Sequence, residues 1–264
     1  KDLATKGIGI FRKIIEMHNL SYRTPSCEWL TKEWISYHED IKQVQNILLA
    51  TGIVPLICKL ITFSVHDEVK QECILCAIAL LLGGNIQAQS SFSNYMSNDK
   101  DNSFIVKLKE MLSKHFNTVE KLEKRSLSLN QKYSFGKSDT TAPGELPNTE
   151  AMLGSRWTDD EEEKPAESLE IARVILRFLQ LLMENQNRTL QDHLREQYGS
   201  LGQRLGRSVD LITLMAEMLK SYTKWVQTNN CHFGMQLIDT LTDSVQGPCS
   251  KNQNALSQAK IEGM

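Results

Sequence analysis

Residues 51–85 read TGIVPLICKLITFSVHDEVKQECILCAIALLLGGN, and this stretch decides the fold. Gly52 ends one helical pattern, because glycine adopts the left-handed C-terminal conformation at little cost. A short apolar helix is then predicted from Ile53 to Thr62 and a longer one from Glu68 to Leu82, where Gly83-Gly84-Asn85 stops it. A glycine break, a short helix and a long helix in this order are typical of armadillo-type repeats, although the sequence shows no clean period of about 40 residues.

The same helical spacing continues on both sides of this stretch. Apolar residues recur every three or four positions rather than every second position, so the patterns predict helices and not strands. These patterns cover residues 8–18, 44–49, 104–129, 171–182, 209–226 and 235–245. The sequence therefore predicts an all-α fold, an armadillo-like helical solenoid with a disordered insert.

The segment 133–168 differs in composition, with prolines at 143, 147 and 165, many Ser, Thr and Gly residues, and an acidic run at 159–163. It has too little apolar surface to offset the entropy lost on ordering, which predicts a flexible acidic insert. The acidic run does not predict a calcium site, because adjacent acids do not supply preorganised ligands. The predicted organisation is a helical module at 1–132, the insert at 133–168 and a second helical module at 169–264.

The composition is that of a globular protein without a charge that attracts polyanions. Of the 264 residues, 41% are hydrophobic and 23% are charged, and the formal net charge is -2. No nucleic-acid partner is therefore expected. The longest apolar run, Cys73 to Leu82, is about half as long as a membrane-spanning helix, and no segment has the layout of a signal peptide.

Cys73 and Cys76 form a Cys-x-x-Cys pair, a spacing compatible with zinc binding or redox chemistry. Both lie in the apolar helix predicted to end at Leu82, and no second pair of Cys or His follows at zinc-finger spacing. The interpretation as small apolar core residues is therefore favoured. Six cysteines are too few for a disulfide scaffold of this length, which favours a reducing cytosolic setting.

No hydrolase, zinc-protease, dinucleotide-binding or kinase motif is present, and the six histidines have no metal-ligand spacing. The chain is therefore predicted not to be an enzyme. The enzymatic alternative requires a pocket that contains titratable groups with perturbed pKa values, which only a structure reveals.

Two places carry acidic residues beside apolar helix faces. Glu184 follows Leu181 by three positions and closes the predicted helix at 171–182. On the predicted helix at 235–245, Asp239, Asp243 and Gln246 share one face. The opposite, core-facing stripe consists of Ile238, Leu241 and Val245. Acids on neighbouring solenoid helices can supply half of a calcium site, although helical carboxylates are more often simply solvated.

Three strings resemble the intracellular calcium-release channels. They are Leu81 to Asn85 with Gln87, Gln89 and Phe92; Arg177 to Asn187 with Leu190-Gln191 and Leu194-Arg195; and Leu241 to Cys249 with Asn252-Gln253. Their order and separations are similar to those of the region shared by inositol trisphosphate and ryanodine receptors. The Gly-Gly-Asn block and the Glu-Asn-x-Asn-Arg string favour the inositol trisphosphate receptors.

The resemblance covers about Val44 to Gln258 and implies an armadillo-like cytosolic region near the membrane end of a homotetrameric channel. It implies a location on the cytosolic face of the endoplasmic or sarcoplasmic reticulum. The implied partners are other domains and subunits of the same channel, with membrane contact only through a channel domain outside these residues. Neither the ligand-binding core nor the pore lies in them.

The resemblance also implies a regulatory calcium ion. In that family, an activating site takes acidic ligands from this region and a further ligand from the juxtamembrane part, and the matching positions are Glu184 and Asp243. Asp243 replaces a glutamate and has a shorter reach, and Gln186 stands where a histidine is often found. The function implied is a cytosolic regulatory segment that couples ligand and calcium sensing to the pore. The alternative is a passive α-solenoid scaffold for protein–protein interaction, and calcium titration discriminates the two.

Overall fold

The computed structural model describes residues 2–20, 32–135, 159–198, 202–203, 207–228 and 230–259. Helices linked by short turns make up this part of the chain. They are α1 (Asp2–Leu20), α2 (Lys32–Ala50), α3 (Ile53–Phe63), α4 (Asp67–Leu81), α5 (Ile86–Asn98), α6 (Ser103–Phe135), α8 (Asp159–Met183), η1 (Glu184–Gln186), α9 (Arg188–Arg195), α10 (Leu211–Tyr222), α11 (Cys231–Val245) and α12 (Ser250–Gln258). The predicted all-α class is confirmed.

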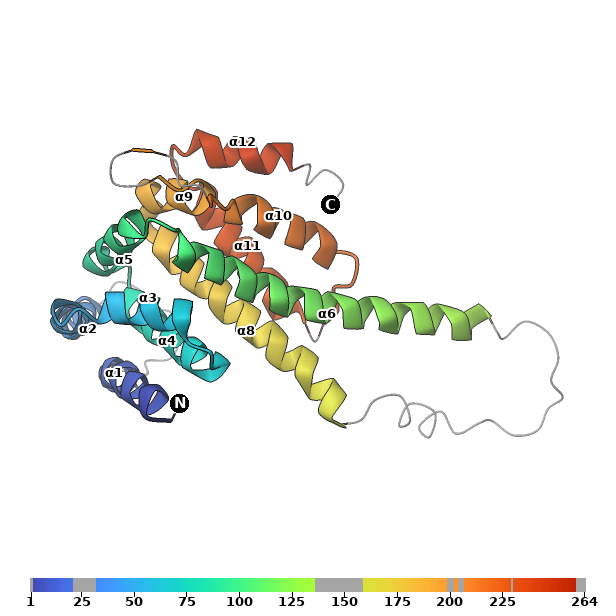
Figure 1. The fold of residues 1–264 in the computed structure, drawn as a ribbon, viewed down its shortest axis with the longest axis horizontal. Coiled ribbons are helices and arrows are strands. Elements are labelled where there is room, and N and C mark those ends of the chain that lie inside the picture. The colour runs from blue at the N-terminus through green and yellow to red at the C-terminus, as the bar shows by residue number, and fades with distance from the viewer. Residues whose placement is uncertain are drawn as a thin grey trace.

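The helices form three successive three-helix repeats: α2–α3–α4, α5–α6–α8 and α9–α10–α11. The third helices pack side by side in chain order, α4 on α8 and α8 on α11, and α1 packs on α4 ahead of them (Figure 1). The first helices α2, α5 and α9 make a second row, which α12 continues. The second helices α3, α6 and α10 make a third row. Each repeat therefore packs on its neighbours in the chain, which is the armadillo-like solenoid predicted from the sequence.

The unequal repeat lengths explain why the sequence shows no clean period. In the first repeat the second and third helices have 11 and 15 residues, whereas α6 and α8 have 33 and 25. Helix α6 runs to Phe135 and α8 begins at Asp159, so helix occupies both ends of the predicted insert. The acidic run at 159–163 forms the start of α8, where the helix dipole favours negative charge. Residues 136–158 lie outside the described residues, and the division at 133–168 stays a prediction.

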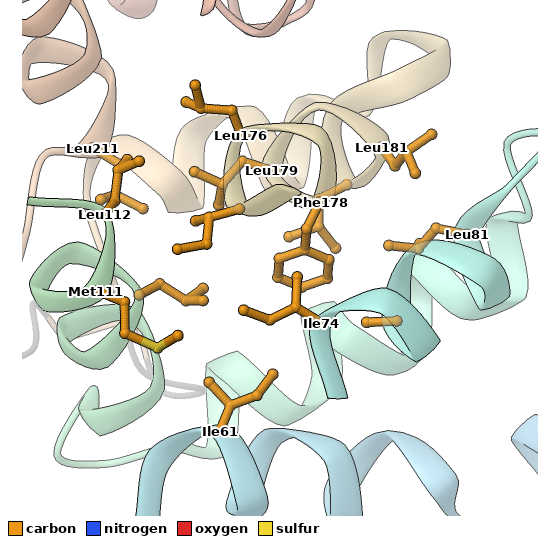
Figure 2. Close-up of a cluster of buried hydrophobic side chains, with 14 of the residues drawn as sticks. Ile61, Ile74, Leu81, Met111, Leu112, Leu176, Phe178, Leu179, Leu181 and Leu211 are labelled. Carbon is orange, nitrogen blue, oxygen red and sulfur yellow. The ribbon is translucent and has the colours of Figure 1, made fainter. Parts of the chain in front are cut away.

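One hydrophobic core runs through all three repeats. Side chains from α3, α4, α6, α8 and α10 converge in it around Phe178 (Figure 2). The Phe178 ring makes edge contacts with Phe92 and Phe104, with ring centroids 5.4 and 6.3 Å apart. Because burying one such side chain contributes about 1.5–3 kcal/mol, this centre fixes how α8 sits against α5 and α6 of its own repeat.

The core-facing side of α11 agrees with the prediction at Leu241, which is buried, and differs from it at Ile238. Ile238 is 50% exposed and Met235 is 60% exposed, whereas Leu237, Thr240 and Ser244 are buried. Thr240 can be buried because its hydroxyl donates to the backbone oxygens of Leu176 and Gln236, at 3.2 and 2.7 Å. Small polar residues thus line the contact with α8, a role that an apolar pattern does not reveal. Consequently Asp243 lies beside the buried face of α11 and is half-buried, while Asp239 is exposed.

No single helix in the described ranges has both the length and the apolar composition to cross a membrane. The segments 40–50 and 53–63 meet that test only as a pair, bent by 70°.

Candidate functional site

Each third helix ends in a corner where the backbone adopts positive φ. The corner residues are Gly83 and Gly84 after α4, Asn185 and Gln186 after α8, and Gly247 after α11. These corners contact one another. Asn185 Nδ2 donates to the Gly84 oxygen at 3.3 Å, and a Cβ added to Gly247 would lie 2.7 Å from Gln186 Oε1. The ends of successive third helices are therefore stacked in one column.

A buried glutamine on the first helix of each repeat caps the end of the third helix. Its side-chain amide nitrogen donates to two backbone oxygens that have no partner inside that helix. The bonds run from Gln45 to Ala79 and Leu82 (2.8 and 3.1 Å), from Gln89 to Leu181 and Glu184 (3.1 and 2.9 Å), and from Gln191 to Asp243 and Gln246 (2.7 and 3.0 Å). We call these three residues the ladder glutamines.

Asparagines link each ladder glutamine to the next repeat. Asn85 Nδ2 donates to Gln45 Oε1 at 2.8 Å, and Asn187 Nδ2 donates to Gln89 Oε1 at 3.1 Å. Both asparagines also cap the following helix through their side-chain oxygens. In the third repeat Asn252 Nδ2 donates instead to the backbone oxygen of Gln191 at 3.0 Å.

Sequence reasoning missed the ladder, although a signal was present. In two repeats an asparagine directly follows the corner and a glutamine follows four residues later, as Asn85–Gln89 and Asn187–Gln191. An asparagine at a helix start followed by an amide one turn on the same face is a short-range pattern that a repeat search can use.

The structure brings the two predicted ligand residues to neighbouring helix ends. Glu184 is the first residue of η1, directly after α8, and Asp243 lies in the last turn of α11. Both are half-buried. Glu184 Oε2 is buried without a hydrogen-bond partner among the described residues. An orphaned carboxylate oxygen of this kind suits a cation, because a buried acceptor without a partner is unfavourable.

The two acids are close enough for the charge of Asp243 to affect the pKa of Glu184. Burial raises the pKa of Glu184, the positive charge of Arg177 opposes this, and the negative charge of Asp243 raises the pKa further. A hydrogen bond from the backbone of Gly84 lowers it. The surroundings of Glu184 therefore offset its negative charge only in part. A divalent cation bound by the two acids would offset the rest.

The pair is not a complete metal site. Within the described residues there is no group of three or more His, Cys, Asp or Glu side chains able to hold a metal ion. Calcium takes about six to eight oxygen ligands, so the two carboxylates by themselves would supply only part of such a shell. Gln246, predicted to share one face with Asp239 and Asp243, is exposed beyond the end of α11.

The Cys-x-x-Cys pair lies away from these corners, in the core. Cys73 and Cys76 are both fully buried in α4. Burial raises the pKa of Cys73 to about 12. The thiol therefore stays protonated at neutral pH, whereas metal binding and redox attack need the thiolate. The interpretation as core residues is confirmed.

Two comparisons bear on these corners. Residues 166–263 match the family model described as RyR and IP3R Homology associated, a stretch that contains Glu184 and Asp243. The inositol 1,4,5-trisphosphate receptor itr-1 of Caenorhabditis elegans is 35% identical over 107 residues, which is 38% of this chain and 4% of that receptor. This chain therefore matches only a small part of that relative. The likeness is to an ion-channel family and not to an enzyme.

Proposed function

We propose that this chain is a cytosolic regulatory segment of an intracellular calcium-release channel, because residues 166–263 match the family model described as RyR and IP3R Homology associated. It contributes two ligands, Glu184 and Asp243, to an activating calcium site. The observation that carries this proposal is the buried oxygen of Glu184, which has no hydrogen-bond partner among the described residues and lies near the charge of Asp243.

The incomplete shell supports a regulatory role. Two carboxylates alone hold calcium weakly, so tight binding requires oxygens from another part of the channel. Calcium then stabilises the orientation in which that part closes on the corners of α8 and α11. Such a difference in affinity between two orientations is what shifts a gating equilibrium.

The solenoid supplies a stiff connection for this coupling. The third helices share one core, and the corner column and the ladder glutamines tie their ends together. A displacement at one end of the stack is therefore passed to the acids. The partners are the other domains and subunits of a homotetramer at the reticulum membrane.

The test is channel opening as a function of cytosolic calcium, in the channel that carries this segment. Glu184→Gln and Asp243→Asn should each raise the half-activating calcium concentration by about tenfold or more, in line with metal-site substitutions generally. Asp239→Asn is the matched control, because Asp239 is exposed one turn before Asp243. Asp243→Glu should increase calcium sensitivity if reach limits the site. An activation curve unmoved by both charge-removing substitutions would eliminate the assignment.

A passive scaffold is the second candidate function. Leu56, Phe63 and Val65 are exposed apolar residues that line an open hollow of about 440 Å³ beside α1, α3 and the start of α4. Exposed apolar surface of this kind favours a protein contact. A scaffold would show no calcium-dependent change in stability or opening, which the same titration measures.

A further inference from the structure

We propose that Gln89 and Gln191 are positioning residues of this cation site, because they hold the backbone at the two candidate ligands and so set the gap between the two carboxylates. This inference rests on the proposed function. The two glutamines do not contact the ion themselves and act through Glu184 and Asp243.

Each of these glutamines reaches the backbone of one candidate ligand. Gln89 Nε2 lies 2.9 Å from the Glu184 oxygen, and Gln191 Nε2 lies 2.7 Å from the Asp243 oxygen. Both glutamine side chains are 1% exposed, so water does not compete for these bonds. The last carbonyls of a helix have no partner within it, and the glutamines therefore decide where each end settles.

The two glutamines are also connected to each other. Asn187 donates to Gln89 Oε1 and caps the start of α9, the helix that carries Gln191. A continuous path thus runs from Glu184 through Gln89, Asn187 and α9 to Gln191 and Asp243. Moving the end of α8 against the end of α11 strains this path, so the path fixes the separation of the acids.

The first repeat provides an internal control for a purely structural role. Gln45 is buried like the other ladder glutamines and donates to Ala79 and Leu82, neither of which carries a charge. Asn85 supports Gln45 as Asn187 supports Gln89. Breaking the ladder at Gln45 therefore removes the same kind of capping while the backbone oxygens of both acids keep their glutamine bonds.

The experiment compares Gln45→Met, Gln89→Met and Gln191→Met in the channel that carries this segment, since methionine keeps the length of glutamine but has no N–H. The measurements are the half-activating calcium concentration, the maximal open probability and the rise in the channel's thermal unfolding temperature on addition of calcium, which should be smaller for the Gln89 and Gln191 variants than for the Gln45 variant. We expect Gln89→Met and Gln191→Met to raise the half-activating concentration by about tenfold relative to Gln45→Met, as supporting residues of metal sites do. The maximal open probability should be the same in all three.

A gentler pair covers the case in which a methionine variant does not assemble. Asn187→Ser and Asn85→Ser keep a helix-capping residue and remove the bond to the ladder glutamine. Asn85→Ser also removes the bond from Asn85 to Asn46. Asn187→Ser should shift the calcium curve in the same direction, and Asn85→Ser should leave it in place.

Equal calcium curves for the Gln45, Gln89 and Gln191 variants, or for the two serine variants, would overturn the positioning role. If Glu184→Gln and Asp243→Asn do shift the curve in that case, the calcium site stands and only the positioning role is lost. If neither acid substitution moves the curve, the proposed function itself is wrong, whatever the glutamine variants do.

Discussion

The corner after α4 and the corner after α8 perform the same turn with different residues. The first uses Gly83 and Gly84, for which positive φ is inexpensive. The second uses Asn185 and Gln186, with φ of 62° and 57°. Asparagine adopts this conformation more readily than most residues, whereas for Gln186 it is unfavourable by roughly 1–2 kcal/mol. The strained corner is the one that follows Glu184. Strain of this kind is often retained where a backbone must hold a functional group in place.

The repeats also differ in the residues that the ladder glutamines hold. Ala79, Leu181 and Asp243 occupy one equivalent position, and Leu82, Glu184 and Gln246 occupy the other. An acid therefore occurs once at each position and is not part of the repeat itself. The comparison indicates that the solenoid does not need these acids for folding.

The largest expected effect comes from placing an acid at the equivalent position of a repeat that has none there. Leu181→Asp puts an aspartate at the position equivalent to Asp243, but Leu181 is only 1% exposed. An uncompensated buried charge should lower the free energy of unfolding by about 3–5 kcal/mol, measured by thermal or urea unfolding of the chain. The reciprocal control is Asp243→Leu, which should change stability by less than about 1 kcal/mol because the site is half-buried. Equal losses in both variants would break the comparison.

The close packing of the corners is tested by adding one methyl group. In Gly84→Ala the new Cβ would clash with Asn185 Nδ2, at φ +66°. Displacing Asn185, losing its hydrogen bond and straining the backbone should together lower stability by about 2–3 kcal/mol. Gly52→Ala is the control, since φ is +78° there but nothing lies within 4 Å of the added Cβ. It should lose only about 1 kcal/mol in the same unfolding measurement.

The smallest expected effect is a pH dependence at Glu184. Burial raises its folded-state pKa above the ordinary value of 4.5, so as pH rises the unfolded state loses this proton first and stability falls. Glu184→Gln removes that loss. The variant should therefore be more stable than the unsubstituted chain at pH 7 in urea unfolding, and the difference should vanish below about pH 4.

The Asp243 charge is one cause of the raised pKa of Glu184. The gain from Glu184→Gln at pH 7 should therefore be smaller in an Asp243→Asn background. Additive effects of the two substitutions would show that the acids do not interact, and would separate the two corners.

The sequence by itself determined the helices, the glycine corners and the family resemblance. Helical periodicity and the glycines that end helices are local properties of the sequence. The turns at Gly52, Gly83 and Gly84 can therefore be predicted without knowledge of the fold. The resemblance also placed Glu184 and Asp243 as candidate ligands. The structure places both residues at the ends of neighbouring third helices, and their role as ligands stays a prediction.

Only the tertiary structure decided which polar residues are buried. Gln45, Gln89 and Gln191 look like surface residues in the sequence, and Ile238 looks like a core residue, yet their exposures are the reverse. A side-chain amide can be buried without loss of stability only where it donates hydrogen bonds to otherwise unpaired carbonyls. Those carbonyls belong to helices far away in the chain. The pairing of helix ends, and with it the electrostatic interaction between Glu184 and Asp243, depends on contacts between repeats that no local pattern encodes.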